Sequence, residues 1–153
     1  MSATCFVQVD NLPRIHIVDR SSHTVPVQLI LIALGGALGS VCRYGLSTLV
    51  QRASAPAFPW GTLFVNVAGC LLVGALGALL APPGRLHDAQ PLRVFLVTGV
   101  LGGFTTFSAF ALETVMLYER GQALTAAAYV LSSTVACVVA AALTYVVVAA
   151  ALR

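Results

Sequence analysis

Residues 102–110, GGFTTFSAF, place two glycines and two threonines inside a long apolar stretch. Glycine and threonine are weak helix formers, so this composition favours an interruption in mid-span over a continuous helix. An interrupted helix is tolerated at membrane depth only where protein or water satisfies the freed backbone groups. Unwound carbonyl oxygens could bind Na⁺, and the positive end of the following half-helix favours an anion. The pattern therefore predicts an ion site at this break.

Aromatic and acidic side chains follow the break. Phe107 and Phe110 lie three residues apart, so they share one face of the half-helix. Such a pair ordinarily packs against other helices, but ring edges are electropositive and could contact an anion in a pore. Glu113 continues the same stripe toward the helix end. It could lie at the membrane interface or line the pore, and the stripe favours the pore.

Other apolar stretches carry isolated polar residues. An Arg such as Arg43 costs about 2.5–3.5 kcal/mol at a helix centre, so it should be paired, face a watery cavity or snorkel to the interface. Asn66 needs a partner, because an unpaired buried amide costs roughly 1–3 kcal/mol; another helix or an anion would serve. Tyr129, Ser133 and Cys137 recur every four residues. They predict either a polar pore wall or hydroxyls bonded back to their own helix.

The composition shows which elements must hold these residues. Of 153 residues, 59% are hydrophobic and 8% are charged, whereas an average soluble domain has about 25% charged residues. The apolar runs are too long for barrel strands, and about 20 residues suffice to cross the hydrocarbon as a helix. We therefore expect an all-α integral membrane protein, without the clustered basic face that nucleic-acid binding requires. The expected organisation is a polar tail at 1–26, which is a flexible cytoplasmic segment or a misplaced start, and a four-span domain at 27–152 with spans at about 27–50, 60–80, 92–117 and 123–152.

The arginines give only a weak bias to the orientation. Four spans place both termini on one side of the membrane. If that side is cytoplasmic it holds Arg14, Arg20, Arg85, Arg93 and Arg153, against Arg52 and Arg120 on the other side. The positive-inside rule then favours termini in the cytoplasm, although the bias depends partly on the tail. A chain with so weak a bias could insert both ways and form an antiparallel dimer, which composition alone does not establish.

Three motifs in this order resemble the CrcB/Fluc family of fluoride channels: GGALGSVCRYG in the first span, GTLFVNVAG in the second and GGFTTFSAF in the third. The resemblance covers about 27–152. It implies an antiparallel homodimer, or a pair of related chains, with two fluoride pathways and a central structural Na⁺ that is not transported. Two positions depart from the family pattern, with Cys137 where serine commonly continues the hydroxyl track and Ala109 where threonine is usual.

The resemblance also implies roles for individual residues. Backbone carbonyls of Gly102 and Thr105 in both subunits would hold the Na⁺. The fluoride pathway would comprise Arg43 in the vestibule, Asn66, the paired rings of Phe107 and Phe110, Ser108, Glu113, and the hydroxyl track of Tyr129 and Ser133.

The implied function is passive, selective efflux of cytoplasmic fluoride through the bacterial inner membrane, without catalysis. Two other classes of four-span protein compete with it. A proton-coupled exporter of the small multidrug type relies on an acid in its first span, where this chain has Arg43 and no Asp or Glu. A non-transporting membrane subunit would use the polar residues only to join helices, which leaves the glycine and threonine interruption unexplained.

Overall fold

The computed structural model describes residues 24–82, 84, 86 and 89–153, and within them every regular element is helical. α1 spans Thr24–Ala53 and α2 spans Trp60–Leu80. The third stretch runs through α3 (Gln90–Arg93), the π-helix η1 (Val94–Leu101), α4 (Gly102–Phe104) and α5 (Phe107–Glu119). α6 spans Ala123–Ala151.

Four helical stretches are long and apolar enough to cross a membrane: Val25–Ala53, Trp60–Leu80, Gln90–Glu119 and Ala123–Ala151. This confirms the prediction of an all-helical chain with four apolar helices. The observed helix ends differ from the expected spans by at most three residues, because polar and helix-breaking residues flank each apolar run. Of the expected tail, 24–26 belong to α1, and 1–23 lie outside the described residues.

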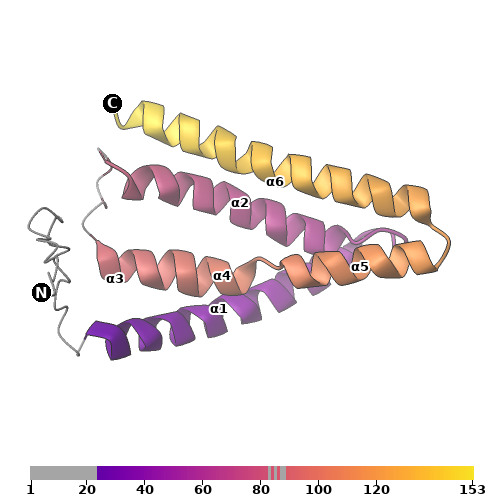
Figure 1. Cartoon of the computed structure of the whole chain (residues 1–153), viewed down its shortest axis with the longest axis horizontal. Coiled ribbons are helices and arrows are strands. Elements are labelled where there is room, and N and C mark those ends of the chain that lie inside the picture. The colour runs from indigo at the N-terminus through magenta and orange to yellow at the C-terminus, as the bar shows by residue number, and fades with distance from the viewer. Residues whose placement is uncertain (1–23, 83, 85, 87–88) are drawn as a thin grey trace, which may run out of the picture.

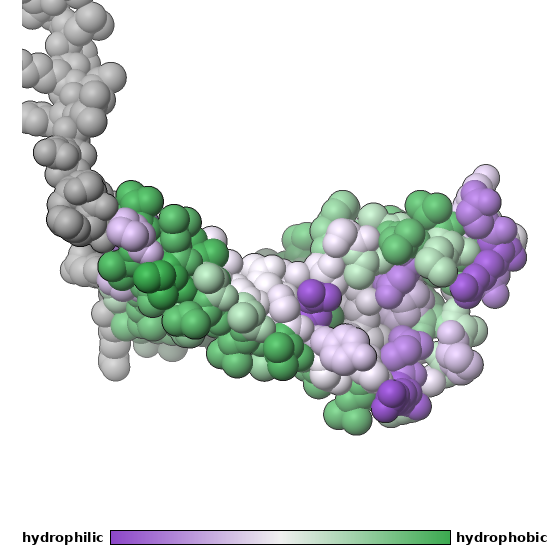
Figure 2. Space-filling view, turned by 90° about the horizontal axis from the view of Figure 1, so that it is seen from below, coloured by the Kyte–Doolittle hydropathy of each residue, from purple (hydrophilic) through white to green (hydrophobic). Residues whose placement is uncertain are grey.

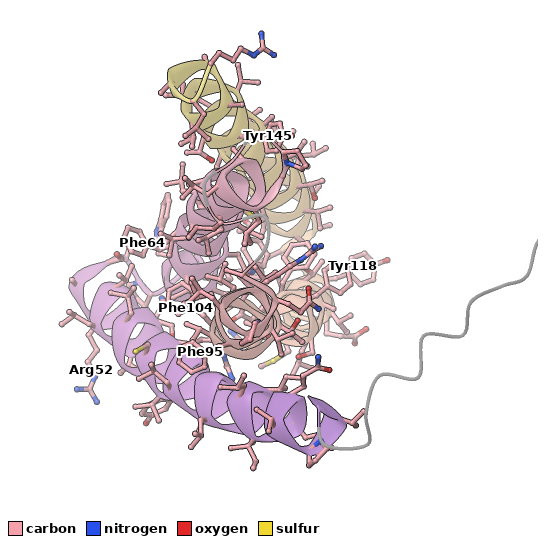
Figure 3. All side chains as sticks on the ribbon, turned by 90° about the vertical axis from the view of Figure 1, so that its left-hand side faces the viewer. Arg52, Phe64, Phe95, Phe104, Tyr118 and Tyr145 are labelled. Atoms are coloured by element: carbon pink, nitrogen blue, oxygen red, sulfur yellow. The ribbon has the colours of Figure 1, made fainter. Side chains whose placement is uncertain are left out.

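The helices are arranged as a stack rather than a round bundle. α6 packs on α2, α2 also contacts the third stretch, and α1 lies against η1 and α4 on the far side (Figures 1 and 3). α1 begins at the same end of the molecule at which α6 ends, as expected for an even number of spans. Phe104 lies inside the stack, whereas Arg52 and Tyr118 extend away from it (Figure 3).

Glycine allows the close contact between α1 and η1. A Cβ atom at Gly35 would lie 2.7 Å from the carbonyl oxygen of Phe95, and one at Gly39 would lie 2.9 Å from the amide nitrogen of Phe104. Small residues let helix backbones approach in lipid, where van der Waals packing replaces the hydrophobic effect. The GxxxG segment of the first span therefore positions η1 and α4, which lead into the break.

The surface is largely apolar. Only 6–28% of the residues in the most apolar window of each span are buried within the single chain. Figure 2 shows hydrophobic residues over much of one face, with hydrophilic residues gathered mainly at the end that carries the α1–α2 and α5–α6 connections. A face of this kind needs lipid or another protein chain to cover it, because monomeric soluble proteins rarely expose large apolar patches.

Candidate functional site

The third stretch changes conformation at two consecutive threonines. α4 ends at Phe104, and Thr105 (φ −84°, ψ 155°) and Thr106 (φ −149°, ψ 115°) are extended before α5 begins at Phe107. The Thr106 hydroxyl accepts a hydrogen bond from the amide of Ala109 at 3.2 Å and so caps α5. β-branched residues fit extended backbone well, and threonine is a good N-cap.

Asn66 on α2 binds the backbone of Thr106 with both halves of its amide. Its Oδ1 accepts from the Thr106 N–H at 2.8 Å, and its Nδ2 donates to the Thr106 carbonyl at 3.0 Å. These groups would otherwise be left without helical partners at membrane depth, which is costly. The structure thus places Asn66 as a bridge between helices. A primary amide carries two N–H donors, and within the described residues Nδ2 uses only one of them.

Arg43 on α1 also reaches this region. Its Nε donates to the carbonyl oxygen of Gly103 at 3.0 Å, and the Ser40 hydroxyl lies 3.5 Å from the same oxygen. In a continuous helix that carbonyl would accept from the amide of Phe107. Arg43 is therefore held against the break instead of extending freely to the interface. Its role in a vestibule stays a prediction.

Two carbonyl oxygens next to the break lose their helical donors. The amide of Thr106, which would bond to Gly102, donates to Asn66, and the amide of Ala109, which would bond to Thr105, donates to Thr106 Oγ1. Within the described part of the chain no other hydrogen bond reaches either carbonyl oxygen. Gly102 and Thr105 therefore offer backbone oxygens, the kind of group that binds a hard cation such as Na⁺ at a broken helix.

Glu113 on α5 is joined to two other helices. One carboxylate oxygen accepts from the Thr62 hydroxyl of α2 at 2.8 Å, and the other accepts from the Tyr129 hydroxyl of α6 at 2.7 Å. Tyr129 is fully buried and Thr62 is nearly so. Hydrogen bonds to an ionised carboxylate contribute about 1.5–3 kcal/mol each. Glu113 is partly buried and links three helices through these hydrogen bonds.

Aromatic rings continue from α5 into this network. The ring centroids of Phe107 and Phe110 are 5.4 Å apart, and those of Phe110 and Tyr129 are 5.1 Å apart, both in tilted arrangements. Phe110 is partly buried against Tyr129 and Leu117, whereas Phe107 is 79% exposed. The two phenylalanines therefore share a face as predicted from their spacing, but only Phe110 is packed within the single chain.

A cavity of about 440 Å³ lies beside the break, between α2, the third stretch and α6. Asn66, Phe107, Phe110, Gly102, Thr105 and Ser133 are among the residues that line it. The Ser133 hydroxyl is buried and has no hydrogen-bond partner within the described residues. Ser132, by contrast, bonds back to the carbonyl of Tyr129 at 3.3 Å. The cavity thus brings together two phenylalanines, the Asn66 amide and a serine whose hydroxyl has no partner within the described residues.

Several predicted residues lie elsewhere, and others were missed. Arg43 and Glu113 do not line this cavity; Glu113 borders a second one with Thr62. Ser108 Oγ lies 3.3 Å from Thr106 Oγ1 on an exposed part of α5. Thr62, Thr106 and Cys70 were not singled out as site residues. A polar residue one turn before Asn66 and another one turn after it could have indicated that this face of α2 is functional.

Comparison with known proteins agrees with this geometry. The family model described as "CrcB-like protein, Camphor Resistance (CrcB)" matches residues 30–145, which is most of the chain. The chain belongs to the CrcB family. A member from Paracoccus denitrificans is 60% identical over 104 residues, which cover 68% of this chain and 80% of the relative. A member from Rhizobium etli is 50% identical over 107 residues, which cover 70% of this chain and 84% of the relative. A member from Agrobacterium fabrum is 49% identical over 114 residues, which cover 74% of this chain and 90% of the relative.

Each of these three CrcB proteins is named a fluoride-specific ion channel. The family resemblance inferred from the three motifs is thus confirmed. All three motifs lie within the matched region, residues 30–145. Together with the four apolar helices, membership makes this chain a multi-pass membrane protein. CrcB proteins of this kind are channels and not enzymes.

Proposed function

We propose that this protein is a fluoride channel that lets cytoplasmic fluoride leave the cell passively and so limits its toxicity. The observation that supports this best is the cavity beside the break, which is lined by Phe107, Phe110 and Ser133, the last with a buried hydroxyl that has no partner within the described residues. A buried hydroxyl without a partner costs about 1–3 kcal/mol, and a small anion that accepts a hydrogen bond would offset that cost. Relatives up to 60% identical are named fluoride-specific channels.

The proposed pathway replaces water around fluoride in small steps. Asn66 would donate its second N–H and Ser133 its O–H to the anion. The edges of the Phe107 and Phe110 rings would add a weak positive potential. The extended segment at Thr105 and Thr106 places the start of α5 beside the cavity, where the helix dipole favours an anion. We assign Ser108, Tyr129 and Glu113 to the continuation of this pathway and Arg43 to its entrance.

We also propose that the carbonyl oxygens of Gly102 and Thr105 hold a structural Na⁺ that is not transported. The donor set fits, since both are neutral backbone oxygens freed at the break. When bound, the ion would supply positive charge that stabilises the unwound backbone. Two oxygens from one chain are few for a hard cation, so a second copy contributing the same pair would complete the site.

A second copy is therefore part of the proposal. The chain would assemble as an antiparallel homodimer, or with a paralogous chain, so that the break lies in mid-membrane at the dimer centre. The exposure of Phe107 and of the apolar helix faces supports this arrangement, because they lack cover within one chain. The weak arginine bias is compatible with insertion of the chain in both orientations.

Anion efflux from liposomes tests the proposed function. Purified protein is reconstituted, the vesicles are loaded with fluoride or with chloride, and each anion is followed with an ion-selective electrode. We expect fluoride to leave far faster than chloride, and the efflux to need no proton gradient. Equal chloride efflux, or none of either anion, would falsify the proposal. Efflux that requires a proton gradient would instead favour the exporter class.

Labelling tests the assembly separately. A single cysteine introduced at Arg120, in a chain whose own cysteines are replaced, is labelled in intact cells with a membrane-impermeant reagent. Dual insertion predicts that about half of the protein is labelled from outside and the rest only after the cells are opened. Labelling from one side alone would argue against an antiparallel homodimer but would not contradict the proposed channel activity.

A further inference from the structure

The register between α2 and α6 aligns two cysteines. These helices run side by side in the same direction (Figure 1). A Cβ atom at Gly74 would collide with the carbonyl oxygen of Ala141, so these two residues face each other at close range. One helical turn earlier on each helix stand Cys70 and Cys137. Residues four apart share a helix face, so these two side chains also face each other.

Both cysteines border the cavity of the proposed pathway. Cys70 and Cys137 both line it, together with Asn66 and Ser133. The helix register turns the two side chains toward each other, and both residues are only partly buried. Neither forms a disulfide. Two thiols that line one cavity are a pair of soft ligands, in contrast to the hard carbonyl oxygens at Gly102 and Thr105.

We propose that Cys70 and Cys137 form a binding site for a soft, thiol-seeking metal cation such as Cd²⁺, and that the bound metal obstructs the ion pathway. The obstruction depends on the proposed fluoride channel, whereas the metal site does not. On binding, each S–H bond breaks, two sulfur–metal bonds form, and two protons leave to water without any change of oxidation state. No oxidant is required.

The coordination chemistry sets the expected strength and selectivity. Within the described residues no cluster contains three or more His, Cys, Asp or Glu side chains, so a closed structural zinc site of four such ligands is not formed here. Water, or the oxygens of Asn66 and Ser133, would complete the coordination of a metal held by two sulfurs. We therefore expect reversible binding that favours soft cations over Na⁺ or Mg²⁺, which prefer oxygen.

The test uses the full chain with Cys5 and Cys42 replaced by serine, which leaves only the proposed pair. Binding of Cd²⁺ to the purified protein is followed by sulfur-to-cadmium charge-transfer absorbance, and fluoride efflux from liposomes is measured in parallel. We expect Cd²⁺ to give the absorbance band and to inhibit efflux. In Cys70→Ala and Cys137→Ser, the concentration for half-inhibition, relative to each variant's own efflux, should rise at least about tenfold.

The double variant distinguishes a shared site from two separate thiols. If both sulfurs bind one ion, Cys70→Ala with Cys137→Ser should be no less sensitive than either single variant, since one loss already destroys the chelate. Additive losses, or a full absorbance band in either single variant, would overturn the shared site. Absorbance without inhibition would overturn the obstruction. If the parent conducts no fluoride, the absorbance still decides the metal site.

Discussion

Replacement of Asn66 by alanine tests whether this side chain holds the break in place. The change removes two hydrogen bonds, at 2.8 and 3.0 Å, from the backbone of Thr106. Each contributes about 1 kcal/mol by soluble-protein measurements and about 0.6 kcal/mol between membrane helices. An unpaired amide of Thr106 adds about 1–3 kcal/mol if it stays buried. We therefore expect Asn66→Ala to destabilise the fold by about 1–5 kcal/mol.

Thermal unfolding in detergent measures this loss. For a chain of this size 1 kcal/mol corresponds to about 2–4 °C in the midpoint, so a decrease of several degrees is expected, together with reduced fluoride efflux. Thr144→Val is the matched control. Among the described residues its hydroxyl bonds only to carbonyls of its own helix, Ala140 at 2.9 Å and Ala141 at 3.2 Å, so its removal leaves none of their amides unpaired.

Asn66→Asp separates the two roles of the amide. An aspartate can still accept from the Thr106 N–H, but when ionised it lacks both donors and would repel an anion in the cavity. We expect part of the stability to return while efflux stays low. If Asn66→Ala lost efflux but kept the parent's unfolding midpoint, the side chain would act only on the anion, and the reasoning about the break would be wrong.

Three further variants test other parts of the site. Phe107→Ile and Phe110→Ile should each abolish fluoride efflux without changing the oligomeric state in size-exclusion chromatography; unchanged efflux in either would refute its pore role. Glu113→Gln and Tyr129→Phe should show a coupling of about 1–3 kcal/mol in a double-mutant cycle of unfolding, because they share a 2.7 Å bond; strictly additive effects would contradict this. Gly74→Ala should overpack the α2–α6 contact and lower the stability by about 1–3 kcal/mol, whereas Gly45→Ala, with open space around it, should not; equal unfolding midpoints for the two variants would count against the register.

The helix ends were predictable because each depends on local sequence. The second span runs from Trp60 to Leu80 as expected, since a proline precedes Trp60 and two prolines follow Ala81. Weak helix formers also cluster at the two threonines, and an interruption was predicted there on that basis. The π-helical winding of η1 has no comparable local signature. It accompanies the close contact of Gly35 with the chain around Gly99, which only the tertiary structure specifies.

The partners of the polar side chains were not predictable from one sequence. Asn66 was expected to need a partner, but its spacing does not indicate that the partner is the backbone of Thr106, forty residues later. Glu113 was predicted to line the pore, but its bonds to Thr62 and Tyr129 were not predictable because they depend on three helices meeting. Small-residue motifs show that a helix packs closely, yet they do not name its neighbour.

The hydrogen bonds at the break show which backbone groups find partners within one chain and which do not. Asn66 forms hydrogen bonds with the amide and the carbonyl of Thr106, and Arg43 donates one to the carbonyl of Gly103. The carbonyls of Gly102 and Thr105 receive no donor within the described residues. Side chains from α1 and α2 thus stabilise the interruption from inside the chain. The two carbonyl oxygens that receive no hydrogen bond have the right chemistry for a cation. That these two oxygens are left unpaired within the described residues supports the proposed ion shared between two copies, because a simple kink would not require it.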